Sequence, residues 1–134
     1  MHGFPGDDTV VEVDGHIGHG AVLHGCRIKR NAMVGMNAVV MDQAVVGEDS
    51  IIAAMSFIKA GMVIPPRSLV MGAPARVMRE LAEKEIAWKV FGTRQYQDLT
   101  LRSMQTMREV ESKDEVEPDR KRIEFGLDMH MPNE

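Results

Sequence analysis

The stretch VGMNAVVMDQAVVGEDSIIAAMSFIKAGMVIPPRSLV, residues 34–70, repeats with a period of six. An amphipathic helix would place apolar residues three and four apart, and a simple strand would alternate by two, so the period fits neither. A small residue often follows four positions after the repeated one, as at Ala38 and Ser50. The repeated residues are all β-branched aliphatics: Val34, Val40, Val46, Ile52, Ile58, Ile64 and Val70.

This period suits a chain that turns a corner every six residues and sends one side chain per side toward a common axis. Three sides make one coil of about 18 residues, and stacked coils form a parallel β-helix. The sequence therefore predicts a mainly β fold with a narrow core of aliphatic layers. The aromatic content of 4% agrees with such a core. The alternative is an ordinary β-sandwich with a chance periodicity.

The pattern extends upstream and ends downstream. Upstream it continues through Ile28 and, after a slip of one residue, through Leu23, Ile17 and Val11. Downstream it weakens at Pro65–Pro66 and stops after MGAPAR, residues 71–76. We therefore expect a β-helix over residues 1–76, C-terminal helices that pack on it over 77–110, and a charged flexible tail over 111–134.

The segment after the repeats shows helical spacing of its apolar residues. It predicts a first helix from Val77 to Phe91 and a second from Arg94 to Glu109, separated by Gly92–Thr93. Trp88 falls on the apolar stripe of the first helix, so we expect it to pack in the core or between helix and prism.

Composition excludes several classes of function. The net charge of −4, with both signs mixed, argues against a nucleic-acid surface. The single cysteine allows no internal disulfide. No charged-then-apolar leader opens the chain, and no apolar run approaches the ~20 residues of a membrane span. We expect a cytoplasmic protein with no membrane partner.

The stretch GHIGHGAVLHGC, residues 15–26, concentrates histidines beside glycines. His19 and His24 are five residues apart and fall on consecutive sides of one coil, so they cannot face one point within a single prism. They could share a metal ion if prisms pack side by side, which demands an oligomer. His2 precedes His19 by about one coil. Alternatively, these histidines fill corners and bond to the backbone.

These residues carry a family resemblance. GHIGHGAVLHGC, the repeats that follow and MGAPAR resemble the γ-class carbonic anhydrase-like hexapeptide proteins, most closely the phenylacetic acid degradation (PaaY-like) and carnitine-operon (CaiE-like) branch. The resemblance covers roughly residues 1–110. It implies a left-handed β-helix, a homotrimer and a zinc-type site at each subunit interface. It implies His2, His19 and His24 as the ligands, the middle one from a neighbouring subunit. Imidazole also suits Fe²⁺ or Co²⁺.

The resemblance also implies a reaction. Three imidazoles with an open fourth position form the catalytic zinc arrangement, which lowers the pKa of bound water to about 7. Zinc-bound hydroxide would then attack CO2, or an acyl-CoA thioester in the PaaY-like branch. Two other functions remain open. One is a hexapeptide acyl-CoA-dependent acyltransferase with a histidine as general base, and the other is a catalytically inactive trimeric scaffold.

Three further residues need interpretation. Asn37 lies one coil after the ligands, where it either reaches the pocket rim as a catalytic candidate or is a simple corner residue. Cys26 is either a small buried hydrophobe or a functional residue, as a fourth donor or a nucleophile. His16 has no ligand counterpart in the family and is expected to be structural or to support a ligand.

The resemblance implies further coils upstream of Met1. We therefore expect an N-terminally truncated chain, either a fragment or the product of an internal start. Residues 1–10 contain Gly3, Pro5 and Gly6 and make a poor strand. We expect them to be the least protected part of the prism, with His2 the weakest ligand.

Overall fold

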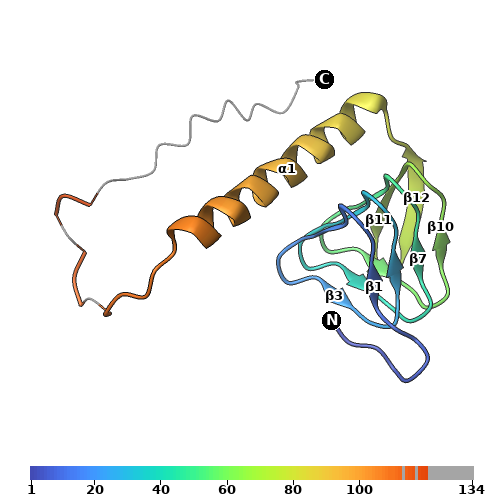
Figure 1. Ribbon diagram of the computed structural model, residues 1–134. Helices are drawn as coiled ribbons and strands as arrows, with labels where there is room; N and C mark the ends of the chain where they lie inside the picture. The colour runs from blue at the N-terminus through green and yellow to red at the C-terminus, as the bar shows by residue number, and fades with distance from the viewer. Residues whose placement is uncertain (113, 117, 121–134) are drawn as a thin grey trace.

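The computed structural model describes residues 1–112, 114–116 and 118–120. Short strands form a three-sided prism, and a long helix, α1 (Glu83–Thr106), lies beside it (Figure 1). Among the described residues, no helix has the length and apolarity to cross a membrane. The strands, in chain order, are β1 (Val10–Val11), β2 (His16–Ile17), β3 (Val22–Leu23), β4 (Arg27–Ile28), β5 (Met33–Val34), β6 (Val39–Val40), β7 (Val45–Val46), β8 (Ile51–Ile52), β9 (Phe57–Ile58), β10 (Val63–Ile64), β11 (Ser68–Gly72) and β12 (Ala75–Glu80).

Each coil contributes one strand to each side of the prism. The three sheets have the orders β1-β4-β7-β10, β2-β5-β8-β11-β12 and β3-β6-β9. All neighbours pair in parallel except β11 and β12. The predicted parallel β-helix with hexapeptide repeats is confirmed.

The register reproduces the repeat and its slip. Val34 pairs with Ile52, a spacing of one full coil, whereas Ile17 pairs with Val34 one residue earlier than a full coil. The missing residue belongs to the corner between β3 and β4, since Leu23 and Ile28 are five apart.

The core is the axis of this prism. The second residue of each two-residue strand from β3 to β10 points inward and is at most 1% exposed, as at Val34 and Ile58. The small corner residues Ala32, Ala38 and Ala44 are fully buried as well. Fully burying one such aliphatic side chain contributes about 1.5–3 kcal/mol, so the stacked layers are the main source of stability.

The last coil ends in strand rather than helix. β12 pairs antiparallel with β11, so the prediction of a helix beginning at Val77 is wrong for residues 77–80. An edge strand leaves N–H and C=O groups unpaired, and β12 satisfies those of β11. The chain turns at Leu81, which is buried and donates its N–H to the Arg67 carbonyl at 2.7 Å.

Helix α1 is continuous, so the predicted break at Gly92–Thr93 is wrong. One glycine inside a helix costs only about 1 kcal/mol relative to alanine, and Thr93 is buried where the helix meets the prism. Trp88 is not a core residue, because 42% of it is exposed. Of the predicted tail, residues 113, 117 and 121–134 lie outside the described residues.

Candidate metal centre

His24 lies at the end of β3 and is held by a carboxylate from the next coil. Its Nδ1 lies 2.6 Å from Asp42 Oδ1, and both side chains are about one quarter exposed, at 24% and 28%. Metal-binding histidines commonly bond a carboxylate through the nitrogen that does not face the ion. The contact therefore leaves His24 Nε2 as the nitrogen available to a ligand.

His2 supplies a second nitrogen at the same corner. Its backbone bridges β3, donating to the Leu23 carbonyl at 3.0 Å and accepting from Gly25 N–H at 2.9 Å. The rings of His2 and His24 stack with centroids 5.0 Å apart, and His2 Nδ1 lies 3.1 Å from His24 Nε2. Two nitrogens on one tetrahedral zinc ion, with bonds of ~2.05 Å, lie ~3.3 Å apart. The separation of 3.1 Å is that of a hydrogen bond between the two imidazoles, and it is also close to the separation of two ligands on such an ion.

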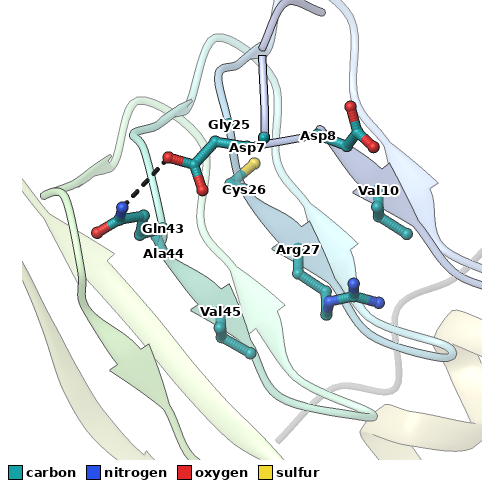
Figure 2. Close-up of a pocket in the computed structure, with 10 residues that line it drawn as sticks. Asp7, Asp8, Val10, Gly25, Cys26, Arg27, Gln43, Ala44 and Val45 are labelled. Carbon is teal, nitrogen blue, oxygen red and sulfur yellow. Dashed lines mark hydrogen bonds between the residues drawn. The ribbon is translucent and has the colours of Figure 1, made fainter. Parts of the chain in front are cut away.

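The loop after His2 is tied to the turn that holds His24. Thr9 donates its hydroxyl to the His2 carbonyl, and Gln43 donates from Nε2 to Asp7 Oδ2 at 3.2 Å (Figure 2). Gln43 directly follows Asp42. One turn therefore holds the His24 ring and also fixes the loop that carries His2.

This loop borders a cavity of about 360 Å³ on the β1, β4 and β7 side of the corner (Figure 2). Asp7, Asp8, Arg27 and Gln43 supply its polar groups. Cys26 forms part of the wall but is only 2% exposed, and burial raises the pKa of its thiol. Cys26 is packed in the aliphatic core, as a small buried hydrophobe would be.

His19 lies at the opposite end of β3 and is exposed. The structure does not bring it to His2 and His24. Within the described ranges, no group of three or more His, Cys, Asp or Glu side chains is placed to hold a metal ion. One chain therefore presents two imidazoles at one corner of the prism and the third at the next corner.

Asn37 lies beside His19 and not beside the His2–His24 pair. Its N–H donates to the His19 carbonyl at 2.9 Å, and its side chain is exposed. That Asn37 reaches the rim of a pocket stays a prediction, because the His19 beside it is expected to serve a site shared with a neighbouring copy.

His16 contacts helix α1 instead of the other histidines. Its Nδ1 lies 3.2 Å from Thr93 Oγ1, and its ring meets the edge of Tyr96 at 5.3 Å. Burial lowers the pKa of His16, and the charges of Lys89 and then His19 lower it further. A neutral His16 that joins helix and prism matches the expectation of a structural residue.

Sequence reasoning missed Asp42 and Gln43. The signal for Asp42 was present, because it follows His24 by 18 residues and so lies one coil away. Gln43 carried no comparable signal, since its partner Asp7 lies in an irregular loop.

Known proteins share this architecture. Residues 25–60 match the family model described as bacterial transferase hexapeptide (six repeats). The carnitine operon protein CaiE of Citrobacter koseri is 54% identical over 92% of this chain and 62% of its own length. A proposed acetyltransferase of Bacillus cereus has a TM-score of 0.77 and 33% identity over 79% of this chain and 62% of its own. A hexapeptide transferase family protein of Anaplasma phagocytophilum has a TM-score of 0.70 and 36% identity over 75% of this chain and 58% of its own.

The chain thus spans about 62% of the length of the CaiE relative. The shared feature is the stack of six-residue sides, which both the strand register and the relatives display. This chain belongs to the bacterial transferase hexapeptide-repeat family and is similar to its CaiE proteins.

Proposed function

We propose that this chain forms a metal-dependent, γ-carbonic-anhydrase-like site between copies of itself in a homotrimer. His2 and His24 come from one copy, and His19 comes from its neighbour. The observation that carries the proposal is the pair of ring nitrogens 3.1 Å apart, with His24 Nδ1 held by Asp42 at 2.6 Å. Zn²⁺ suits three imidazoles, and Fe²⁺ or Co²⁺ would also be accepted.

The placement of His19 supports the need for a neighbour. His19 and His24 lie at opposite ends of β3, so a second prism packed on this side could bring its His19 to the first prism's His24. The outward residues of this side, Val22, Val39 and Phe57, lie in one row across β3, β6 and β9. Val22 is 50% exposed and Phe57 39%, which gives the side an apolar surface suited to another copy.

The chain's residues would divide the work at this site. His2, His24 and His19 bind the ion, and Asp42 fixes the tautomer of His24 and raises its strength as a ligand. An ion held by three imidazoles lowers the pKa of a bound water to about 7 and so supplies a nucleophile at neutral pH. The substrate would be an electrophilic carbon, as in CO2 or an acyl-CoA thioester.

Metal content and turnover of histidine variants test the proposal. The wild-type chain should bind about one metal ion per chain and form a trimer by light scattering. His19→Ala and His24→Ala should lose most of the metal and with it CO2 hydration or thioester hydrolysis. His16→Ala is the matched control and should keep the metal. A monomeric chain, or metal loss only in His16→Ala, contradicts the assignment.

A second function is acyl transfer from acyl-CoA, with a histidine as general base. It is favoured by the likeness to the Bacillus cereus protein described as a proposed acetyltransferase. A lone base needs only one of the two imidazoles, and the other would then be its hydrogen-bond partner at 3.1 Å. Acetyl-CoA-dependent acylation that persists after metal removal would favour it over the metal site.

A further inference from the structure

His19 and His24 both stand at corners of the prism, His19 two residues after Ile17 of β2 and His24 one residue after Leu23 of β3. Each is followed by a glycine, Gly20 or Gly25, that adopts a positive φ, of +71° or +51°. Each is followed in the next coil, 18 residues later, by a residue that can accept a hydrogen bond through its side chain. That residue is Asn37 for His19 and Asp42 for His24. For His24, the hydrogen bond to this residue is present.

The two acceptor oxygens are placed alike. A Cβ added to Gly25 would lie 2.6 Å from Asp42 Oδ1, and a Cβ added to Gly20 would collide with Asn37 Oδ1. In both corners, therefore, the oxygen lies over the glycine that follows the histidine. Only glycine leaves room for it, because any side chain at position 20 or 25 would occupy the same space.

The backbone ties Asn37 to His19 in addition. Asn37 N–H donates to the His19 carbonyl at 2.9 Å, and Asn37 has a φ of +56°, which fixes the turn that directs its side chain. Among the described residues, only this backbone bond joins the two. The His19 ring is exposed, so it can turn toward the Asn37 oxygen when an ion fixes its other nitrogen.

We propose that Asn37 is a positioning residue for His19, its side-chain oxygen accepting a hydrogen bond from His19 Nδ1–H as Asp42 does from His24. This inference rests on the proposed metal site and adds a role that the site's own ligands do not supply. It also makes the two supports unequal, because a neutral amide strengthens an imidazole ligand less than a carboxylate does. His19, the ligand that crosses between copies, is then the more weakly supported of the two.

The experiment compares four forms of the full chain loaded with Co²⁺, whose visible absorption reports ligand geometry. Asn37→Gly removes the oxygen and tolerates the positive φ, whereas Asn37→Asp keeps an acceptor. Met55→Gly is the matched control, since Met55 lies one coil further along the same corner with a φ of +61° and is 70% exposed. Affinity is measured by competition with a chelator, and trimer mass confirms that each form assembles.

We expect Asn37→Gly to weaken Co²⁺ binding about 10- to 100-fold and to change the absorption bands. Asn37→Asp should bind at least as tightly as wild type, and Met55→Gly should match wild type in both readouts. Wild-type affinity and spectrum in Asn37→Gly would overturn the role of Asn37 while leaving the metal site standing. A wild-type chain that binds no Co²⁺ would overturn the proposed function and this inference together.

Discussion

The prism and helix α1 bury opposite kinds of side chain. Along the prism axis the buried residues are aliphatic, whereas the two buried residues of α1 are Lys89 and Thr93. The apolar residues of the helix, such as Trp88 and Phe91, are 42% and 50% exposed. A repeat fold supplies its own core, coil against coil, so an added helix can attach through polar contacts with the corners.

Those polar contacts are specific. Lys89 Nζ donates to the Asp14 carbonyl and to Asn31 Oδ1, both at 2.6 Å, and Gln97 donates to Asp14 Oδ1 at 2.9 Å. Burial lowers the pKa of Lys89 to about 8, against the nearby charges of Asp14 and Asp49, which raise it. Helix docking is therefore sensitive to protonation, whereas the aliphatic axis is not.

The largest expected effect comes from opening the axis. Ile52→Ala should lower the free energy of unfolding by about 2–5 kcal/mol, because it leaves a cavity between fixed coils. Leu101→Ala, on a residue of α1 that is 59% exposed, should cost about 0.5 kcal/mol or less. Denaturant titration of the two variants measures the contrast. Equal losses would mean that α1 belongs to the same cooperative core.

Two glycine substitutions should change stability in opposite directions. A Cβ on Gly35 would lie 2.5 Å from Ala54 N, so Gly35→Ala forces neighbouring coils apart and should cost about 1–3 kcal/mol. Gly92 in α1 has nothing within 4 Å of such a Cβ, so Gly92→Ala should stabilise by about 0.5–1 kcal/mol. Thermal unfolding of both reports the signs. A destabilised Gly92→Ala would show that the helix is packed where we find space.

The pH dependence of stability isolates Lys89. The unfolded lysine, with a pKa of 10.5, binds more protons than the folded one, with a pKa of about 8. The free energy of unfolding should therefore rise by up to about 3 kcal/mol as the pH rises from about 8 to 10.5.

Lys89→Met should remove this rise, as seen by chemical denaturation at a series of pH values. Because the pKa of Cys26 is raised in the folded protein, its ionisation lowers the free energy of unfolding above pH 9. This contribution is the same in wild type and in Lys89→Met, so the difference between them reports Lys89 alone. An unchanged pH profile in Lys89→Met would rule out the amine as its source.

The smallest effect concerns the contact between Thr93 and His16. Thr93→Val keeps the shape but removes the hydroxyl 3.2 Å from His16 Nδ1, and should cost about 1 kcal/mol. Thr100→Val, whose exposed hydroxyl bonds only the Tyr96 carbonyl in the same helix, should change stability by a few tenths of that. Thermal shift assays compare the pair, and a larger loss for Thr100→Val would contradict a role for Thr93 in docking.

Much of the prism was predictable from sequence, because one physical constraint recurs at every coil. The inward position must be aliphatic, so the β-branched residues that recur every six positions between Val34 and Val70 reveal the period. The five-residue step from Leu23 to Ile28 reveals the slip. Helix α1 was predicted less well because its apolar stripe does not mark its contact side. The stripe includes Trp88, which is 42% exposed, whereas the residues of α1 that are buried are Lys89 and Thr93.

The candidate site, too, was predictable in part from the sequence. Coil arithmetic separates His19 from His24, as the structure does. It sets His2 about one coil from His19, whereas the structure pairs the His2 backbone with His24. It does not fix which nitrogen of His2 meets which nitrogen of His24, because that depends on rotamers and on the loop held by Gln43. Contacts between copies lie beyond what one chain's periodicity can specify.

The short corner between β3 and β4 bears on how such chains tolerate length changes. In an ordinary sheet, a one-residue slip turns every following side chain to the wrong face. Here the omission at Gly25 is absorbed within a single corner, since Ile28 pairs with Val46 in the same inward register as Val34 with Ile52. Residues can therefore be deleted or inserted at a corner without rewriting the core. His19 and His24 stand at such corners, so changes in the length of a corner can reposition these side chains while the aliphatic axis stays in register.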